Sequence, residues 1–262
     1  ARAVRPVERE PQPVADPLDA QSGAVIADRF DVLERRGEGS TGTALLAVDY
    51  DSDDTRPLIL KVARNDASGE RLAVEAEVLG RLDHPRVVRR IGGPIQVDGR
   101  TALLLSDAGR ETLATRIATE GRATIEQLEG YGRDLLEAVA HLDDRGVFHR
   151  DIKPANLAIS PDPGTRKPRL ALFDLSLARE PLENTTSGTP GYLDPYLSQR
   201  RQYDRAAELW SVAATLFEMA TGNPLWWPEG TNGPLTPDEA PVVMSTSFED
   251  AVAARLTEFF RR

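Results

Sequence analysis

An octet in the middle of the chain combines the side chains that phosphate chemistry requires. It reads His149-Arg150-Asp151-Ile152-Lys153-Pro154-Ala155-Asn156. Asp151 offers a carboxylate that can orient or deprotonate a hydroxyl, Lys153 a compact ammonium for a phosphate, and Asn156 an oxygen ligand for Mg²⁺. A polar turn after a helix could carry any one of these groups by chance. All three at this spacing favour phosphoryl transfer.

The few lysines of the chain support the same interpretation. Of 32 basic residues only Lys61, Lys153 and Lys167 are lysines, and the others are arginines. An ammonium is a point charge whereas a guanidinium is a planar fork, so the two are not interchangeable beside a phosphate. Lys61 and Lys153 both stand where a phosphate-binding site would use an ammonium, and we expect both to bind phosphate.

A strand and a helix supply a partner for Lys61. Residues 57–63 read as an apolar strand interrupted by this lysine, and a buried ammonium is costly unless an anion meets it. Residues 68–82 have helical spacing, with Glu75 on the apolar face and Glu77 on the other side. We expect Lys61 to pair with Glu75. The alternative is an edge strand with Lys61 in solvent.

A glycine-rich segment stands between two strand-like stretches at 30–33 and 44–48. A dinucleotide-binding turn with this glycine spacing needs a helix directly after its third glycine, and the sequence indicates a strand there instead. Two interpretations remain, a plain hairpin and a loop whose backbone amides cover phosphates. The segment reads Gly37-Glu38-Gly39-Ser40-Thr41-Gly42.

Size and composition exclude several classes of protein. A chain of 262 residues can bury one large core or two small ones. Its formal net charge of −10 argues against binding to nucleic-acid backbones or anionic membranes, and the absence of cysteine excludes disulfides and thiolate metal sites. No apolar run approaches the roughly 20 residues that span a bilayer. We expect a cytoplasmic protein that binds neither nucleic acid nor membrane.

The motifs follow one another in a familiar order: the glycine-rich segment, Lys61, the octet, Asp174-Leu175-Ser176, and Gly188-Thr189-Pro190-Gly191-Tyr192-Leu193-Asp194-Pro195. In this order they resemble the catalytic domain of the eukaryotic-like serine/threonine protein kinases, in which a glycine-rich loop between two strands covers the phosphates. The resemblance implies an α+β, bilobal protein kinase-like fold, with a small antiparallel β lobe carrying one main helix and a larger, mainly helical lobe. We expect a flexible proline-rich linker at 1–24, the first lobe with its hinge at 25–108, and a second lobe at 109–262 that is truncated at its C-terminus.

The resemblance also implies roles in the transfer of the ATP γ-phosphate to Ser or Thr hydroxyls. Asp151 would orient or deprotonate the hydroxyl, and Lys153 would neutralise the γ-phosphate. Lysine two residues after the catalytic aspartate is the pattern of kinases that act on Ser and Thr rather than Tyr. Asn156 and Asp174 would bind Mg²⁺. The residues expected around ATP are Gly37, Glu38, Gly39, Ser40, Thr41, Gly42, Ala44, Ile59, Lys61, Glu75, the backbone of Ser106 and Ala108 in the hinge, and Ala158 below the adenine.

The segment that follows Asp174 would position a protein substrate and regulate the enzyme. Arg150, beside the catalytic aspartate, is typical of kinases that are activated when this segment is phosphorylated, because a phosphate there can pair with it. We expect Thr189 to contact the catalytic aspartate and lysine. The candidate phosphate acceptors are Thr185, Thr186 and Ser187, for which an ordinary polar loop is the alternative.

Some positions depart from the family pattern. Leu175 and Ser176 replace Phe and Gly beside Asp174 but leave its carboxylate in place. Tyr196 stands where a glutamate usually anchors the segment through a buried arginine of a later helix, and Glu208 replaces the customary aspartate in the helix at 204–221. These changes leave a pseudokinase as the main alternative, that is, a nucleotide-binding or scaffolding module without transfer activity.

Two further comparisons bear on the class of kinase. Small-molecule kinases of the antibiotic- or choline-phosphorylating type usually carry glycine in place of Arg150 and lack a peptide-positioning loop such as 188–195. The runs at 146–154, 172–182 and 187–195 resemble, more narrowly, the kinase module of bacterial phage-defence systems of the phage-growth-limitation or BREX type. Those kinases are large multidomain proteins, so we expect this chain to belong to a larger parent polypeptide.

Overall fold

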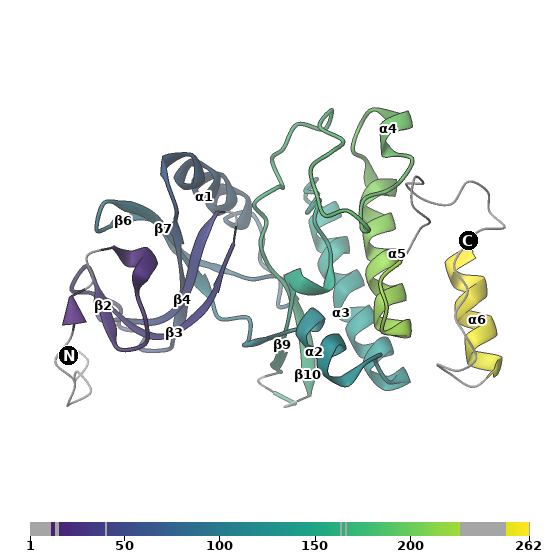
Figure 1. The fold of residues 1–262 in the computed structure, drawn as a ribbon, viewed down its shortest axis with the longest axis horizontal. Helices are drawn as coiled ribbons and strands as arrows, with labels where there is room; N and C mark the ends of the chain where they lie inside the picture. The colour runs from purple at the N-terminus through teal and green to yellow at the C-terminus, as the bar shows by residue number, and fades with distance from the viewer. Residues whose placement is uncertain are drawn as a thin grey trace. The chain divides into compact units, whose positions relative to one another are not determined.

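The computed structural model describes residues 12–13, 16–39, 41–162, 164–165, 167–225 and 250–261. The chain forms two compact units (Figure 1). The first unit consists of Ala1–His84 with Val88–Arg110, and the second of Pro85–Val87 with Glu111–Arg262. Within the described residues, no helix combines the length and the apolar character needed to cross a membrane.

The first unit is built on a seven-stranded sheet. Its neighbouring strands are antiparallel, apart from the parallel pair β1 and β2. Residues of β4 and β5 alternate between the two faces because side chains of a strand point to opposite sides in turn. In spatial order the strands are β1 (Gln12–Pro13), β2 (Ala24–Ile26), β3 (Phe30–Glu38), β4 (Gly42–Asp49), β5 (Leu58–Ala63), β7 (Arg100–Ser106) and β6 (Arg90–Val97).

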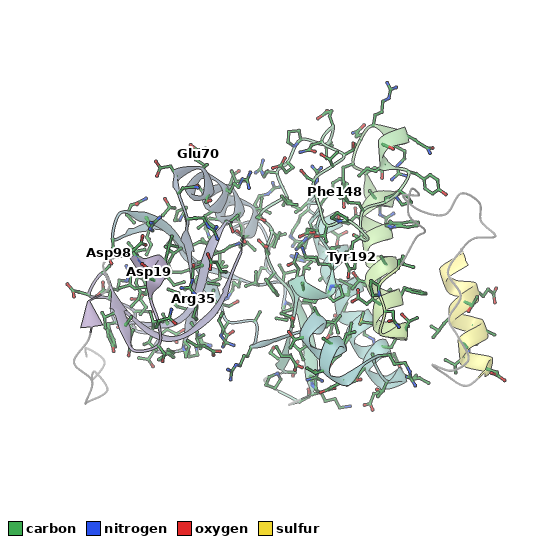
Figure 2. The ribbon with its side chains drawn as sticks, viewed as in Figure 1. Asp19, Arg35, Glu70, Asp98, Phe148 and Tyr192 are labelled. Atoms are coloured by element: carbon green, nitrogen blue, oxygen red, sulfur yellow. The ribbon has the colours of Figure 1, made fainter. Side chains whose placement is uncertain are left out.

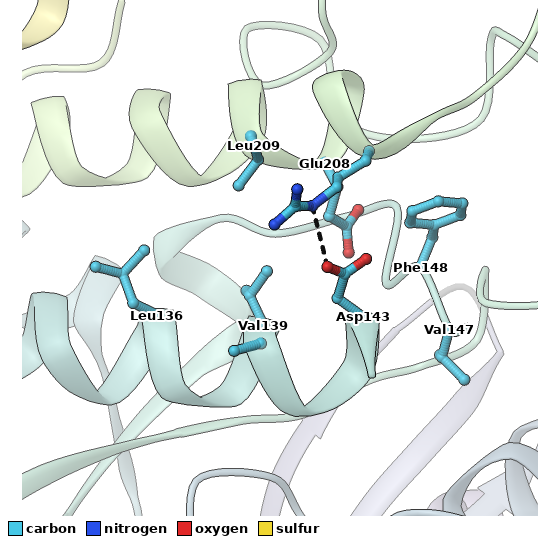
Figure 3. A pocket seen from close by; sticks show the side chains of 9 residues that line it. Leu136, Val139, Asp143, Val147, Phe148, Glu208 and Leu209 are labelled. Atoms are coloured by element: carbon cyan, nitrogen blue, oxygen red, sulfur yellow. Dashed lines mark ion pairs between the residues drawn. The ribbon is translucent and has the colours of Figure 1, made fainter. Parts of the chain in front are cut away.

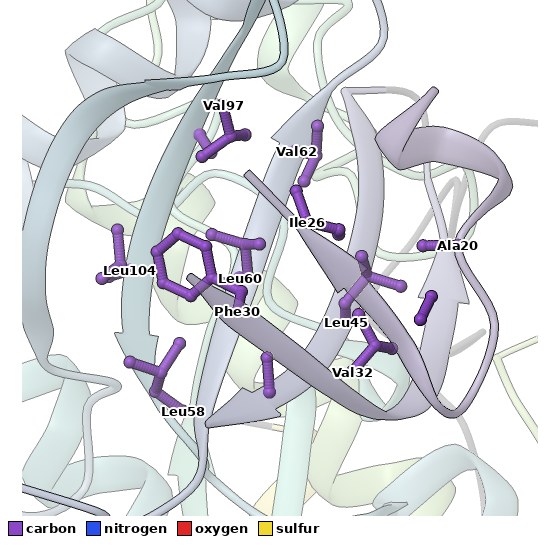
Figure 4. Packing of buried hydrophobic residues seen from close by; sticks show 13 residues of the cluster. Ala20, Ile26, Phe30, Val32, Leu45, Leu58, Leu60, Val62, Val97 and Leu104 are labelled. Atoms are coloured by element: carbon purple, nitrogen blue, oxygen red, sulfur yellow. The ribbon is translucent and has the colours of Figure 1, made fainter. Parts of the chain in front are cut away.

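One face of this sheet carries a hydrophobic core in which Phe30, Leu45 and Leu60 are fully buried (Figure 4). The chain before β2 contributes to the same core. Pro17–Asp19 form a short 3-10 helix, η1, and Ala20 after it is fully buried. The proline-rich composition predicts a linker over 1–24, but residues 17–20 pack onto the sheet, because the small apolar side chain of Ala20 joins the core and Leu18 packs against it.

The other face of the sheet carries the helix α1 (Asp66–Leu79), which lies against β5, β6 and β7. Asn65 caps the helix, since its side chain accepts a hydrogen bond from the Ser68 amide at 2.9 Å. Leu72, Ala76 and Leu79 are buried at helical spacing. The helix thereby presents one face of residues 72–79 to the strand that contains Lys61.

The second unit is mainly helical, with one three-stranded sheet of order β10-β9-β8. Thr124 and Gln127 form the capping box expected at the start of α3, with hydrogen bonds of 2.9 and 3.2 Å between side chains and amides. The elements are β8 (Glu111–Thr112), α2 (Leu113–Glu120), α3 (Ile125–Asp143), the 3-10 helix η2 (Pro154–Asn156), β9 (Leu157–Pro161), β10 (Pro168–Leu172), α4 (Leu197–Arg200), α5 (Arg205–Thr221) and α6 (Asp250–Arg261).

A buried carboxylate fastens α3 to strand β10. Asp134 is fully buried, and its oxygens accept hydrogen bonds from the Arg169 guanidinium at 2.9 Å and from the Leu170 amide at 3.0 Å. Arg86 lies 2.9 Å from the same carboxylate. Burial raises the pKa of Asp134 above its ordinary value, although the amide and the two arginines act to lower it. Asp134 thus fixes the hairpin β9–β10 on the helix behind it.

Helices α3 and α5 lie side by side and leave an apolar pocket of about 270 Å³ (Figure 3). Leu136 and Val139 of α3 and Leu209 of α5 line it, and an ion pair of 3.0 Å between Arg205 and Asp143 stands at its edge. With its β unit carrying one main helix and its mainly helical second unit, the chain has the α+β, protein kinase-like architecture expected from the sequence.

Candidate active site

The glycine-rich segment forms the turn between β3 and β4. The Gly39 amide donates to the Gly42 carbonyl at 2.8 Å, which closes the turn. A Cβ atom on Gly42 would stand 1.8 Å from the Val62 carbonyl oxygen, so only glycine fits there. A Cβ atom on Gly37 or Gly39 would meet nothing within 4 Å. Packing among the described residues therefore does not require these two glycines. Ser40 lies outside the described residues.

Arg64, just after β5, holds the same turn from the side. Its guanidinium donates to Glu38 Oε1 at 2.8 Å and to the Gly39 carbonyl at 3.1 Å, while its amide donates to the Thr41 carbonyl at 3.1 Å. Sequence reasoning missed Arg64, because an arginine after a strand carries no signal of what it contacts. The arrangement identifies it as a positioning residue of the glycine-rich turn.

The ion pair expected between Lys61 and Glu75 forms. Lys61 Nζ lies 2.7 Å from Glu75 Oε2, with the carboxylate side chain fully buried and the lysine side chain 13% exposed. Lys61 is paired in register with Ala44 on β4, and Ile59 lies two residues before it on the same face. The three predicted ATP-pocket residues of these strands thus share one face of the sheet.

The expected hinge lies at the end of β7. The Ser106 amide donates to the Arg89 carbonyl at 2.8 Å, so this amide is already engaged within the first unit. Asp107 accepts from the Gly109 amide at 3.0 Å and from Arg36 at 3.0 Å. These bonds fix the backbone on both sides of Ala108.

Asp151 stands at the centre of a network in the second unit. Its Oδ2 accepts from Lys153 Nζ at 2.6 Å and from Asn156 Nδ2 at 3.0 Å. Its Oδ1 accepts from Thr189 Oγ1 at 2.6 Å, and Lys153 also donates to Thr189 Oγ1 at 2.6 Å. The contacts expected of Thr189 are therefore present. The network holds the carboxylate and the ammonium in one fixed geometry at the surface of the loop, where their side chains are 14% and 21% exposed.

Glu208, at the start of α5, holds the backbone of the octet. Its oxygens accept hydrogen bonds from the His149 amide at 2.6 Å and the Arg150 amide at 3.1 Å, and Oε2 also accepts from the Tyr203 hydroxyl at 2.6 Å. The glutamate that departs from the family's aspartate therefore still reaches both amides. Arg150 has a φ of 70°, a strained value for a residue other than glycine, and these bonds help to hold it.

The hairpin β9–β10 brings the two predicted metal ligands to one end. Leu157 pairs with Leu172 in register, and the next bond runs from the Phe173 amide to the Asn156 carbonyl at 3.0 Å. Asp174 follows directly, with a φ of 67°. Positive φ values at residues other than glycine strain the backbone, and such residues are concentrated at functional sites. Ala158, which the sequence places below the adenine, lies on β9 and is buried.

The segment 188–204 is attached to α5 through Tyr192 and is braced within itself through Asp194. Tyr192 lies beside α5, where its hydroxyl donates a short hydrogen bond to Glu218 (Figure 2). Burial raises the pKa of Tyr192 and also that of Glu218. Asp194 is buried, accepts from the Tyr196 amide at 2.8 Å and forms an ion pair with Arg200. This local pair braces the segment beside Tyr196, where the family's glutamate is missing.

Arg150 is almost fully buried and uses its guanidinium on backbone carbonyls of residues 180–184. The side chains of Thr186 and Ser187 are hydrogen-bonded to Asn184. The proposed acceptor residues thus lie in a segment whose backbone carbonyls bind Arg150 and whose hydroxyls contact Asn184. Neither Asn184 nor Tyr203, whose ring lies 4.6 Å from the Arg150 guanidinium carbon, carried a signal in the sequence.

Comparisons with known proteins agree with this geometry. The family model described as "Protein kinase domain" matches residues 30–252. The probable kinase PglW of Streptomyces coelicolor is 38% identical, over 94% of this chain and 18% of that protein. The serine/threonine-protein kinase AtPK2/AtPK19 of Arabidopsis thaliana is 31% identical, over 78% of this chain and 43% of that protein. The human ribosomal protein S6 kinase alpha-3 is 29% identical, over 74% of this chain and 27% of that protein.

The chain therefore spans less than half the length of each of these relatives. The family match, in contrast, covers most of the chain, including the glycine-rich turn, the pair Lys61–Glu75, the octet and Asp174. On this match the chain belongs to the protein kinase domain family.

Proposed function

We propose that this chain is a serine/threonine protein kinase that transfers the γ-phosphate of ATP, with Mg²⁺, to Ser or Thr hydroxyls of a protein substrate. The observation that carries the proposal is the network of Asp151, Lys153 and Thr189, in which every polar contact lies at 2.6 Å. Positioning and charge neutralisation supply most of the rate in phosphoryl transfer. A preorganised carboxylate beside a fixed ammonium is the arrangement that this reaction uses.

In this proposal each matched residue has a defined task. Asp151 orients the substrate hydroxyl and accepts its proton, and Lys153 places its positive charge beside the γ-phosphate oxygens. Lys61, held by Glu75, binds the α- and β-phosphates, and the backbone of the glycine-rich turn covers the phosphates. The open space around Gly37 and Gly39 supports this last role, because neither glycine is explained by packing among the described residues.

The donor set of Asn156 and Asp174 fits Mg²⁺. This ion prefers oxygen ligands and is commonly bound through one or two protein groups together with substrate phosphates. A carboxamide and a carboxylate at the end of the hairpin match that preference. Among the residues that the structure describes, no group of three or more His, Asp or Glu side chains could hold a metal by itself. Asn156 and Asp174 would hold the ion, which would supply positive charge that offsets the negative charge of the phosphates.

Specificity for Ser and Thr is supported by Lys153, two residues after Asp151, and by similarity to proteins that are named serine/threonine-protein kinases. Autophosphorylation at Thr185, Thr186 or Ser187 belongs to the same proposal, because all three lie in the segment that follows Asp174. We also place the reaction in the cytoplasm, where cells keep ATP and the protein substrates of such enzymes.

The similarity to the probable kinase PglW supports a bacterial phage-defence role within a larger polypeptide. The similarity extends over 94% of this chain, which corresponds to only 18% of the length of that protein. The sequence runs at 146–154, 172–182 and 187–195 carry the same resemblance. Under this proposal the physiological substrate is a protein of the defence system.

The test is incorporation of labelled phosphate into a generic Ser/Thr protein substrate and into the chain itself. We expect incorporation that requires Mg²⁺ and ATP and that is lost in Asp151→Asn, which keeps the hydrogen-bonding shape but not the base. Binding of Mg²⁺–ATP without transfer by the unsubstituted chain would instead identify a pseudokinase. Phosphoamino-acid analysis showing phosphotyrosine alone would contradict the specificity.

A further inference from the structure

Both terminal nitrogens of the Arg150 guanidinium donate to backbone carbonyls. Nη1 donates to the Glu180 carbonyl at 2.5 Å and to the Pro181 carbonyl at 2.9 Å, and Nη2 donates to the Asn184 carbonyl. The remaining Nε is buried and has no hydrogen-bond partner among the described residues. With the residue 2% exposed, no donor of this guanidinium faces solvent.

Tyr203 closes the other side of this guanidinium. Its ring lies 4.6 Å from the guanidinium carbon, a distance at which a cation is attracted to an aromatic face. Its amide donates to the Leu182 carbonyl at 2.6 Å, and its hydroxyl donates to Glu208, the residue that holds the octet backbone. Tyr203 thus joins the segment at residues 180–184 to Arg150 and to the octet backbone.

Asn184 ties the segment to itself. Its Nδ2 donates to Glu180 Oε2 at 3.0 Å and to Ser187 Oγ at 2.7 Å. Its Oδ1 accepts from the Thr186 amide at 3.2 Å and from the Thr186 hydroxyl at 3.1 Å. The side-chain amide of Asn184 therefore bonds residues on both sides of it, Glu180 before it and Thr186 and Ser187 after it. Its own backbone carbonyl accepts from Arg150.

The residues that directly follow this turn, Gly188 and Thr189, lie against the octet. A Cβ atom on Gly188 would stand 3.0 Å from the Arg150 carbonyl oxygen, which shows how closely the segment passes the octet. Thr189, the next residue, donates to Asp151. A displacement of residues 184–187 would therefore move the hydroxyl that holds the base.

We propose that Asn184 is the positioning residue of this segment and that the unmodified chain holds residues 180–189 in their catalytic arrangement. Phosphate transfer then does not depend on phosphorylation of Thr185, Thr186 or Ser187. The proposal rests on the proposed kinase function.

The charges around the turn support it. An activating phosphate needs accessible guanidinium or ammonium donors, but Nη1 and Nη2 of Arg150 are already bonded to carbonyls and its Nε is buried. A phosphate on Ser187 would also replace the hydroxyl that Asn184 contacts, and Asn184 in turn contacts the Glu180 carboxylate. A new negative charge would be added beside an existing one, where it is repelled.

The first experiment measures the rate before any modification. Protein treated with phosphatase and shown by intact mass to be unphosphorylated is mixed with Mg²⁺–ATP and a protein substrate. We expect a linear progress curve from the first turnovers, and the same rate within about twofold after preincubation with Mg²⁺–ATP. A lag, or an increase of tenfold that follows the appearance of phosphate at residues 185–187, would overturn the proposal.

The second experiment exchanges the polar groups of one contact. Asn184→Asp places two carboxylates at hydrogen-bonding distance, and we expect kcat to fall by about ten- to a hundredfold through misplacement of Thr189, with KM for ATP changed less than twofold. Adding Glu180→Gln restores a hydrogen-bond donor opposite the new carboxylate. The double variant should regain at least half of the decrease in log kcat that Asn184→Asp causes. The control is Asn223→Asp, an exposed asparagine whose side chain contacts the Thr221 carbonyl.

A third measurement does not need activity. Amide hydrogen exchange of the unphosphorylated protein should show protection of the Asn184 and Tyr203 amides, which donate to the Pro181 and Leu182 carbonyls. Asn184→Asp should remove this protection and the double variant should restore it. A wild type that transfers no phosphate under any condition refutes the proposed kinase, while unprotected amides, or an Asn184→Asp variant that behaves as wild type, refute the role of Asn184.

Discussion

Thr189 Oγ1 donates a hydrogen bond to Asp151 Oδ1 across 38 residues of sequence, at 2.6 Å. The same oxygen accepts from Lys153 at 2.6 Å, so one hydroxyl fixes both the carboxylate and the ammonium. A hydroxyl can serve both partners, since it donates to one and accepts from the other. The segment that follows Asp174 therefore contacts both Asp151 and Lys153 through the Thr189 hydroxyl.

Thr189→Val should lower kcat by about ten- to a hundredfold, because it keeps the shape of the side chain but removes the hydroxyl that aligns Asp151 and Lys153. Thr189→Ser keeps the hydroxyl and should retain most of the activity. Steady-state assays with ATP and a protein substrate measure both, and KM for ATP should move little in either variant. Equal losses in the two variants would show that the methyl group matters rather than the hydroxyl.

Glu75→Gln should reduce kcat/KM for ATP by about ten- to a hundredfold, because Lys61 loses the buried carboxylate that holds its ammonium at 2.7 Å. The matched control is Glu77→Gln on the exposed side of the same helix, which should leave kcat/KM within twofold. Calorimetric titration with Mg²⁺–ATP provides the corresponding affinities. Similar affinities for the Glu75 and Glu77 variants would contradict the assignment of Glu75.

The pair Lys61–Glu75 also shows what the sequence can reveal. The strand and the helix each have a clear period, so the face that carries each charge follows from the spacing. The same holds for the octet, whose groups lie within eight residues, and for the capping box of α3. Long runs of regular structure and motifs that are local in the chain are accessible in this way.

The contacts that the sequence does not reveal join single residues in loops. Arg64 donates to a backbone carbonyl, Asn184 to a carboxylate in its own turn, and Tyr203 places its ring on a guanidinium. No periodicity or spacing rule in the sequence indicates such contacts. The residues before β2 differ from the predicted linker for a different reason. Prolines dominate their composition, but the fold of η1 depends on Asp16, which caps it and forms an ion pair of 2.5 Å with Arg100 on β7, far along the chain.

Arg64→Ala should raise KM for ATP by about three- to tenfold with little change in kcat, because the turn at Glu38 and Gly39 loses a partner on its own unit while the octet is untouched. Arg56→Ala removes an exposed arginine whose pairing with Asp54 is local, and it should not alter KM. In a fluorescence titration, Arg64→Ala should bind the nucleotide more weakly than wild type, and Arg56→Ala should bind it as tightly as wild type. A change in kcat alone would contradict this role.

Glu218→Gln should change how stability depends on pH. Burial raises the pKa of Glu218 above its ordinary value of 4.5, against the opposing effect of the hydrogen bond from Tyr192. The folded state therefore binds this proton more tightly than the unfolded state, so the contribution to stability is fully present below pH 4.5 and is lost as the pH rises through the folded pKa. Glutamine cannot ionise and still accepts from Tyr192.

Denaturant unfolding between about pH 4 and pH 8 tests this directly. The free energy of unfolding of wild type, relative to Glu218→Gln, should decrease as the pH rises above 4.5. Glu183→Gln, at an exposed glutamate in the same unit, is the matched control and should show no such trend. A wild type that gains stability over Glu218→Gln with rising pH would mean that the buried environment favours the charged carboxylate.

Asp134→Asn should lower the free energy of unfolding by about 3 kcal/mol, because Arg86 and Arg169 would lose the carboxylate that they share. The Asp134 side chain is fully buried, so solvent screens its attraction to the two arginines less than it would at the surface. Urea unfolding provides the measurement, with Asp144→Asn at an exposed position as the control. Since Asp134 also bonds the Leu170 amide of β10, the hairpin before Asp174 should lose amide protection first. An Asp134→Asn variant as stable as the Asp144→Asn control would mean that desolvation of the three charges already cancels their attraction in the wild type.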